Sequence, residues 1–241
     1  HIVFCRIGHM EYEEAWALQQ KLQDRLITNK RSDSPKSIPH VCLLIEHPPV
    51  FTLGKSGDAS NLLANEAELK SHGATFVKID RGGDITYHGP GQIVGYPILD
   101  LDHFYTDIHR YLRDLEDVII RTCADYNITA DRFEDRTGVW ITGTPGSERK
   151  ICAMGIRCSR WVTMHGFALN MATKLDHFSM IVPCGIDDRG VTSMEMEKLE
   201  QLERSEVENR IMNHFANVFD ARVEMLERND AKAFLEVYLG A

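Results

Sequence analysis

Residues 138–171, GVWITGTPGSERKICAMGIRCSRWVTMHGFALNM, hold the densest group of strand signals in the chain. Apolar and β-branched residues alternate with turn-forming residues in this stretch, which predicts strands over 138–142, 150–157 and 167–171. Strands this short and this closely spaced favour a mixed or antiparallel sheet over a regular β-α-β winding.

Helical patterns lie on both sides of this strand-rich centre. Apolar residues recur at helical spacing over 11–28, near 65–72, over 107–126, after Met194 and over 231–239. Because these helices flank the central strands on both sides, they are expected to cover the sheet.

Further strands are predicted over 41–45, 75–79 and 93–99. No long linker and no internal repeat divides residues 1–241, so a single domain is expected. The predicted fold class is α+β (α/β), with a mixed or antiparallel central sheet flanked by helices.

The composition excludes several classes of protein. Apolar residues make up 43% of the chain and charged residues 26%, proportions that exclude a fibrous or wholly disordered protein. No apolar run approaches the ~18–20 residues that span a bilayer, so no membrane association is expected. The net charge is −9 and no basic stripe is visible, so no nucleic-acid partner is expected.

The six cysteines are too few for a disulfide scaffold, and no C-x-x-C pair suggests a zinc or redox site. No metal site is therefore expected. The segment from His1 to Arg6 resembles neither an export signal nor a transit peptide, so a cytoplasmic location is expected. Cys42 and Cys123 fall within apolar strand and helix patterns and are interpreted as core residues.

Cys184 has a different setting. Pro183 and Gly185 flank it after an apolar pair, so its thiol is expected in a loop at the end of a strand. The pattern fits a nucleophile and a buried turn cysteine equally well. A nucleophile needs the thiolate, and a free thiol with a pKa of ~8.5 supplies little of it at neutral pH.

Three residues compete as the partner that would activate Cys184. Lys150 begins a predicted strand, and a lysine among apolar side chains can exchange protons with a thiol. Regular alternation would place Lys150 on one face with Cys152, Met154 and Ile156. His88 and His165 lie in polar, glycine-flanked motifs, and the residues alone do not decide between a Cys–Lys and a Cys–His pair.

The segment RGGDITYHGPGQ, residues 81–92, contains four glycines and one proline between polar side chains. Such a backbone can approach a ligand closely. The segment matches neither G-x-G-x-x-G nor G-x-x-x-x-G-K-[ST], so it is no known phosphate cradle. Its alternative interpretation is a turn between two strands.

These motifs together resemble the lipoyl(octanoyl) transferases. The resemblance rests on RGGD to Gln92 at 81–92, K-I-x-A-x-G-x-R at 150–157, HGFALN at 165–170 and PCGI at 183–186. The segment EHPPVFTLG at 46–54 is similar to an early motif of the same family. The motifs follow the family's order over roughly residues 41–194.

The resemblance implies roles for individual residues. Cys184 would be the acyl-thioester nucleophile, and Lys150 would lower the pKa of its thiol and shuttle protons, in place of a Cys–His pair. His165 would contact other residues of the site without touching the substrate itself. The substrate-binding residues would be Arg81, Gly82, Gly83, Asp84, Ile85, Thr86, Tyr87, His88, Ala153, Met154, Gly155, Gly166, Phe167 and Ala168.

The resemblance also implies the fold of biotin and lipoate ligases and a reaction. An octanoyl group would pass from octanoyl-acyl carrier protein to a specific lysine of lipoyl domains, the first step of endogenous protein lipoylation. The acceptors would be 2-oxoacid dehydrogenase E2 subunits and the glycine cleavage H protein. Because a thioester donor is already activated, no ATP, cofactor or metal is expected.

Two further expectations follow from this chemistry. Met154, Ile156 and Phe167 would line a slot for the eight-carbon chain. Acyl carrier proteins are acidic, so a basic rim is expected near the site. The candidates for this rim are Arg149, Arg157 and Arg160.

Three other functions stay open at this point. An ATP-dependent lipoate or biotin ligase would share the fold, but it needs no Cys184 and must bind an adenylate. A non-catalytic acyl-binding or carrier-binding module would keep the pocket without turnover. A cysteine thioesterase would release the free acid and leave the lipoyl domain unmodified.

Overall fold

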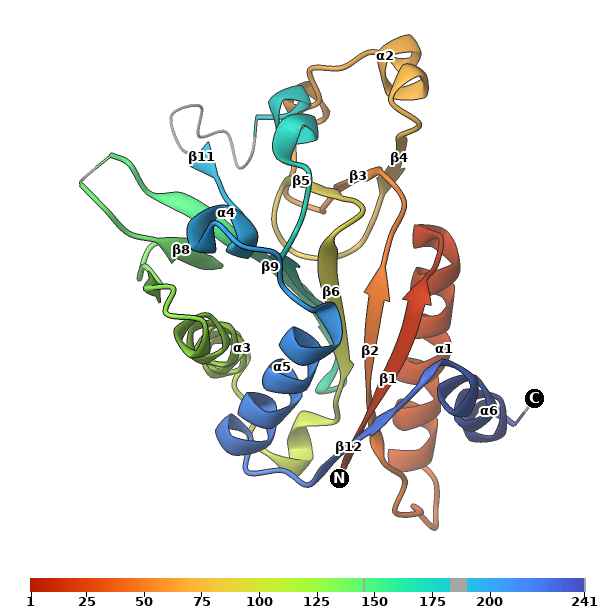
Figure 1. The fold of residues 1–241 in the computed structure, drawn as a ribbon. Helices are drawn as coiled ribbons and strands as arrows, with labels where there is room; N and C mark the ends of the chain where they lie inside the picture. The colour runs from red at the N-terminus through yellow and green to blue at the C-terminus, as the bar shows by residue number, and fades with distance from the viewer. Residues whose placement is uncertain (145, 183–189, 241) are drawn as a thin grey trace.

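Two β-sheets and the helices around them form the structure, a computed structural model that describes residues 1–144, 146–182 and 190–240 (Figure 1). Within these ranges, nine strands form the larger sheet. They are β1 (Ile2–His9), β2 (His40–Glu46), β6 (Gln92–Ile98), β7 (Ala130–Asp131), β8 (Val139–Ile141), β9 (Arg149–Ser159), β10 (Val162–Asn170), β11 (Gly190–Val191) and β12 (Val223–Leu226).

The larger sheet is mixed. Its strands lie in the order β12-β1-β2-β6-β10-β9-β8-β7, and β11 pairs with the beginning of β9. β1 runs parallel to both of its neighbours, β12 and β2. From β2 onward, each neighbouring pair in this order is antiparallel. The predicted α+β fold with a mixed central sheet is therefore confirmed.

A smaller sheet lies beside one end of the larger one (Figure 1). It contains β4 (Thr75–Lys78), β3 (Val50–Leu53) and β5 (Ile85–His88), in that order. Nearby are η1 (Ala59–Asn61), α2 (Glu66–Ser71) and η3 (Leu175–Met180). The connection from β4 to β5 carries the first part of the glycine-rich segment, so this small sheet determines where that segment lies.

Alternation along the strands gives the larger sheet two apolar faces. In β1, Ile2 and Phe4 belong to one core cluster and Val3 and Cys5 to the other. The first cluster is covered by α3 (Ile108–Asp125) and α5 (Arg204–Val218), the second by α1 (Tyr12–Lys30) and α6 (Arg228–Leu239). The remaining helical segments are η2 (Leu101–His103) and α4 (Met194–Lys198).

The central helix α3 follows from its local sequence. The Asp107 carboxylate accepts a hydrogen bond from the Arg110 backbone N–H at 3.0 Å and caps the first turn. Tyr111, Leu115 and Cys123 are fully buried on its inner face. Burial raises the pKa of the Cys123 thiol to about 12, so Cys123 is confirmed as a core residue. No helix in the described ranges is both long and apolar enough to cross a membrane.

β1 is the largest difference between the predicted and the observed elements. Its apolar run is short and is followed by Arg6 and Gly8, so the local pattern does not identify a strand. The partners that hold β1 in the sheet are β2 and β12, which are far away in the sequence. The strand predicted over 167–171 is likewise extended back to Val162, because β10 pairs with β9 from there on.

Phe215 tests the packing of α5 on the sheet. Its ring is fully buried, lies edge-on to Phe4 with the centroids 5.4 Å apart, and stacks on Phe219 at 4.2 Å. We expect Phe215→Ala to lower the free energy of unfolding by about 3–5 kcal/mol, because the vacated volume is not refilled. Urea denaturation measures this change. Val237→Ala, at a side chain that is 82% exposed, is the control, and an equal loss in both variants would contradict the packing described.

Candidate active site

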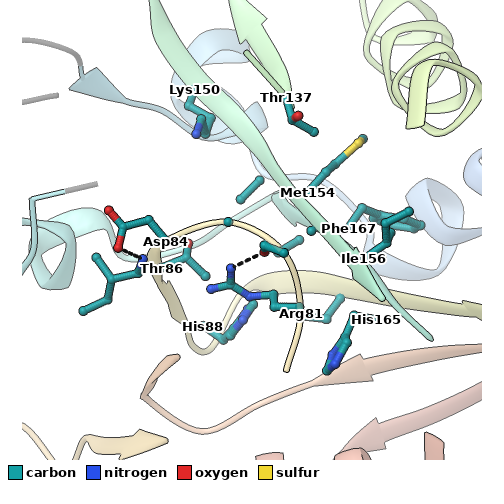
Figure 2. A pocket seen from close by; sticks show the side chains of 18 of the residues that line it. Arg81, Asp84, Thr86, His88, Thr137, Lys150, Met154, Ile156, His165 and Phe167 are labelled. Atoms are coloured by element: carbon teal, nitrogen blue, oxygen red, sulfur yellow. Dashed lines mark hydrogen bonds between the residues drawn. The ribbon is translucent and has the colours of Figure 1, made fainter. Parts of the chain in front are cut away.

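A cavity of about 570 Å³ lies where the loop between β4 and β5 faces the β9–β10 pair (Figure 2). Its volume is typical of small-molecule sites, which span ~300–1,000 Å³. Apolar side chains form one part of the wall and polar side chains another. Figure 2 shows Met154, Ile156 and Phe167 in the first part, Arg81, His88 and His165 in the second, and Lys150 at the edge.

A second hollow of about 820 Å³ lies near Arg160, at the other end of β9. Although it is larger, some of its charged groups are already paired. The Lys30 ammonium lies 2.7 Å from the Asp100 carboxylate and 2.6 Å from that of Asp102. The first cavity is therefore the better candidate for a ligand site.

Pairing of β9 with β10 brings two of the predicted substrate-binding segments together. Gly166 lies opposite Gly155, Phe167 opposite Met154, and Ala168 opposite Ala153. The two segments, thirteen positions apart in the sequence, form one continuous piece of the cavity wall.

The glycine-rich loop packs closely on this wall. The Gly82 backbone N–H donates to the carbonyl oxygen of Ile156 at 2.9 Å. A Cβ atom at Gly155 would lie 2.8 Å from the Gly82 carbonyl oxygen and 3.0 Å from Cδ of Arg81. Only glycine at position 155 therefore lets the loop approach β9 this closely.

Side chains at both ends of the loop anchor it to its surroundings. The buried Arg81 guanidinium donates to the Thr52 carbonyl and hydroxyl oxygens at 2.9 and 3.1 Å. One oxygen of Asp84 accepts from the Ile85 backbone N–H at 2.7 Å, and the other accepts from the Asn61 amide at 2.6 Å. The loop is thus held from both ends against the cavity.

A chain of hydrogen bonds links His88 to the strand beside Lys150. The Nδ1 atom of His88 lies 2.8 Å from Oε1 of Gln92, and Nε2 of Gln92 donates to the Asn170 side-chain oxygen at 3.0 Å. Asn170 donates to the carbonyl of Thr192, whose N–H donates to the Lys150 carbonyl, both at 3.0 Å. Burial lowers the pKa of His88 well below its usual value, so its ring is neutral at pH 7.

His165 is held by a carboxylate. Its Nε2 atom lies 2.9 Å from Asp80, which also pairs with Arg157 at 2.8 Å. The His165 backbone has a φ of 61° and donates its N–H to Gln19 at 2.9 Å. The hydrogen bond from His165, and then the charge of Arg157, lower the pKa of Asp80 against the effect of burial. His165 lines the cavity, but this partner already occupies one of its ring nitrogens.

Lys150 lies at the edge of the cavity, with its ammonium nitrogen 4.7 Å from the centre of the Trp140 ring. The pairing of β8 with β9 is irregular there, because Val139 lies opposite Cys152 and Trp140 opposite Lys150. Ile151 is therefore an extra residue, and it joins Cys152 in the same core cluster. The alternation expected from Lys150 through Cys152 is broken by this bulge.

Cys184, the predicted nucleophile, lies outside the described residues. The chain is described on either side of it. The Val182 backbone N–H donates to the Asn61 carbonyl at 2.8 Å, and β11 pairs with β9 so that Val191 lies opposite Lys150. Both flanks of the segment that carries Cys184 therefore contact residues at the cavity or next to them.

Tyr87 is the one predicted substrate-binding residue that does not line the cavity. Strand alternation in β5 turns it away from His88 and into the apolar cluster of the smaller sheet. There its ring lies 5.2 Å from that of Phe51 and stacks on that of His177 at 4.8 Å. Its role is packing beneath the loop rather than contact with a ligand in this cavity.

The three arginines expected to form a basic rim do not form one patch. Arg149 begins the 11-residue strand β9 and Arg160 follows its end, so about 35 Å of strand separate them. Arg149 donates to both carboxylate oxygens of Glu197 at 2.9 and 3.0 Å, and Arg157 is paired with Asp80. The expectation of a single basic rim is wrong.

Sequence reasoning missed part of the cavity wall. The wall residues that the sequence did not indicate include Tyr12, Tyr96, Ile108, Leu112, Arg136 and Trp140. Ile108 and Leu112 belong to the apolar pattern of α3, which gives no sign that its first turns face a ligand site rather than the core. The other four come from α1, β6 and the region of β8, and only the fold brings them together.

The arrangement suits a ligand with a long apolar part whose reacting end lies beside Lys150. Among the described residues, no group of three His, Cys, Asp or Glu side chains could hold a metal ion. The amine of Lys150 and the imidazoles of His88 and His165 are among the cavity's candidates for proton transfer.

Gly155 tests the close approach of the loop. We expect Gly155→Ala to lower the unfolding temperature by several degrees, because its methyl group would push the Gly82 carbonyl off β9. Gly82→Ala is the matched control in the same contact, since a Cβ there would meet only the Ile156 carbonyl oxygen, at 3.5 Å. Thermal melting curves of both variants measure the effect. Equal stability of the two variants would show that the approach does not require glycine at 155.

Asp80 gives a prediction about pH. Its pKa is lower in the folded protein than the ~3.9 of a free aspartate, so its ionised form stabilises the fold above that pH. This contribution is lost as the pH falls through the folded-state pKa. We expect Asp80→Asn to be less stable than the unchanged protein at pH 7, with a smaller difference below about pH 4. Urea denaturation at both pH values checks this, with the exposed Asp24→Asn as control. A difference independent of pH would contradict the role of the ion pair.

Known proteins share both this sequence and this fold. Residues 11–216 match the lipoyl protein ligase A/B catalytic domain. An octanoyltransferase of Flavobacterium psychrophilum is 55% identical over 223 residues, which cover 90% of this chain and 96% of that protein. An octanoyltransferase of Flavobacterium johnsoniae is 52% identical over the same share of both chains.

The solved structures agree in fold. A bi-partite lipoate protein ligase of Thermoplasma acidophilum has a TM-score of 0.68 at 15% identity, covering 99% of this chain and 94% of that one. Lipoate-protein ligase A bound with ATP has a TM-score of 0.68 at 13% identity, covering 100% and 99%. At such identities the likeness shows the fold alone, and the function follows from the closer sequence relatives. The chain belongs to the octanoyltransferase family, whose catalytic domain is that of the lipoyl protein ligases.

Proposed function

We propose that residues 1–241 act as one catalytic domain that transfers an octanoyl group from octanoyl-acyl carrier protein to a lysine of a lipoyl domain. Cys184 carries the group as a thioester, and Lys150 exchanges protons with it. The observation that carries this proposal is a cavity with an apolar wall and Lys150 at its edge. Each buried CH₂ of an acyl chain contributes about 0.8 kcal/mol, so such a wall can select chain length.

The flanks of the segment 183–189 support Cys184 as the nucleophile. The Val182 backbone N–H donates a hydrogen bond to the Asn61 carbonyl. The Asn61 side-chain amide in turn donates to the carboxylate of Asp84, which lies in the cavity wall. On the other side, β11 pairs directly with the residues that begin β9, including Lys150. The anchoring of both flanks at or next to the cavity is what supports Cys184 as the nucleophile.

The surroundings of the two histidines favour Lys150 over a Cys–His pair. His88 is neutral and has Gln92 at one ring nitrogen and Thr52 3.4 Å from the other. His165 has Asp80 at one ring nitrogen. His88 would have to give up these contacts to serve as a base for a thiol. His165 keeps a buried Nδ1 atom with no hydrogen-bond partner among the described residues, but it lies opposite Ile156, six positions along β9 from Lys150, beside which the described chain continues after Cys184.

The reaction then runs in two displacements. The Cys184 thiolate attacks the thioester carbonyl carbon, the bond to the carrier's sulfur breaks, and that sulfur leaves as a thiol with the proton from Lys150. The amine of the acceptor lysine next attacks the acyl carbonyl, and the bond to Cys184 breaks as the amide forms. Lys150 accepts the proton that the amine releases, which restores the starting state.

The donor and acceptor follow from the family and from this chemistry. A carrier thioester needs no activation by ATP, so the proposed reaction uses no nucleotide and no cofactor. The acceptors are lipoyl domains of 2-oxoacid dehydrogenases and of the glycine cleavage system. A cytoplasmic setting, with reduced thiols, suits a catalytic cysteine.

The test is an acylation assay without ATP. Incubation with octanoyl-acyl carrier protein is expected to add the mass of one octanoyl group to Cys184, and a lipoyl domain is expected to remove it. Cys184→Ala abolishes both events, whereas Cys158→Ala, at the far end of β9, changes neither. Transfer only in the presence of ATP would instead identify a ligase, and release of free octanoate a thioesterase.

Lys150→Ala tests the second catalytic residue. We expect a lower rate of transfer and a pH optimum shifted upward, because more alkaline solution is needed to form the thiolate without the ammonium nearby. The rate against pH, measured with a small octanoyl thioester, checks this. An unchanged pH profile would remove Lys150 from the mechanism and leave Cys184 in place.

A further inference from the structure

Two cationic side chains lie over the ring of Trp140 at the cavity. The Lys150 ammonium nitrogen is 4.7 Å from the centre of its ring, and the Arg136 guanidinium carbon is 5.4 Å away. Arg136 also lies 4.2 Å over the ring of Phe133, which meets Trp140 edge-on at 6.0 Å. All of these except Phe133 line the cavity. Two cations at one aromatic ring, at the edge of a ligand site, are more than core packing requires.

The indole is placed by its strand and is nearly closed off from water. Trp140 is 4% exposed and lies directly opposite Lys150 in the β8–β9 pairing. Its ring nitrogen is buried and has no hydrogen-bond partner among the described residues. The ring therefore presents its π-face to the lysine as its main polar interaction. A cation–π contact is stronger at a ring that is shielded from water than at a fully exposed one.

The turn before β8 makes room for this contact. Gly138 has a φ of 115°, and a Cβ there would lie 2.7 Å from the Cys152 carbonyl oxygen and 3.7 Å from Cε of Lys150. Its backbone N–H donates to the buried Glu116 carboxylate at 2.9 Å, and Arg113 pairs with that carboxylate at 3.2 Å. The helix α3 thus holds the turn, and the turn sets Trp140 against Lys150.

We propose that Trp140 is a positioning residue that holds the Lys150 ammonium over its ring at the cavity edge, while Arg136, paired with the Asp135 carboxylate at 3.0 Å, lies over the same ring. The proposal rests on the proposed function, in which Lys150 exchanges protons with the acyl-carrying sulfur. A long, flexible lysine side chain loses rotamer freedom when it is aimed at one point, and the aromatic face offsets that loss.

The contact itself can be measured apart from catalysis. With 5-fluorotryptophan in place of the three tryptophans, the ¹⁹F resonance that Trp140→Phe removes is that of Trp140. We expect this resonance to shift with pH as Lys150 loses its proton, and the shift to vanish in Lys150→Met. The resonance of Trp161, which is 40% exposed on the β9–β10 turn, is expected to be unaffected. If the Trp140 resonance showed the same chemical shift and the same pH dependence in Lys150→Met as in the unsubstituted protein, the proposal would be overturned.

Kinetics with a small octanoyl thioester test what the contact does. We expect Trp140→Leu to lower kcat about tenfold and to shift the pH optimum upward, in the same direction as Lys150→Ala but less far. Trp140→Phe keeps an aromatic face and is expected to restore most of both effects, and Trp161→Leu is the matched control. Equal losses in the Phe and Leu variants with an unchanged pH optimum would reduce Trp140 to a space-filling residue. Full activity of Lys150→Ala would count against the proposed function, while the ¹⁹F measurement would still decide whether the contact exists.

Discussion

The close approach of one loop to one strand is the constraint on which the site depends. The Gly82 N–H bonds to the Ile156 carbonyl, and only a hydrogen atom on Gly155 leaves space for the loop's own carbonyl. If the loop moved outward by the width of a methyl group, the wall that contains Met154 and Phe167 would lose its opposite side. The cavity is therefore built from backbone contacts, which side-chain motion does not easily undo.

The two sheets contribute different sides of the cavity at this contact. The larger sheet holds β9 and β10 between two buried faces, so the wall that they form is rigid. The smaller sheet carries the loop and anchors it through Arg81 and Asp84. Polar side chains from both sheets take part in the series of hydrogen bonds that runs from His88 through Gln92 to Asn170. This series ends at the backbone carbonyl of Lys150. These hydrogen bonds connect the backbone of Lys150 to His88 in the cavity wall.

The fold alone does not separate a transferase from a ligase, because lipoate ligases share it. The difference has to come from the chemistry at the cavity edge. In this chain a lysine, an aromatic ring and a second cation meet there, and both flanks of the segment with Cys184 reach the same region. A half-buried amine at the edge of a cavity suits proton exchange with a sulfur, and Trp140 and Arg136 lie beside it in the cavity wall.

The amino-acid pattern by itself predicted the helices, most of the central strands, a mixed or antiparallel sheet and the unusual glycine-rich segment, since these depend on periodicity, caps and local motifs. The choice of Lys150 and the acyl-wall segments came from the family resemblance of the combined motifs. The pattern did not determine β1, the bulge at Ile151 or the inward turn of Tyr87. Those features were decided by the tertiary structure, because each depends on a partner distant in the sequence or on the register of a neighbouring strand. The contact of Trp140 with Lys150 is of the same kind, since strand pairing brings the two residues face to face.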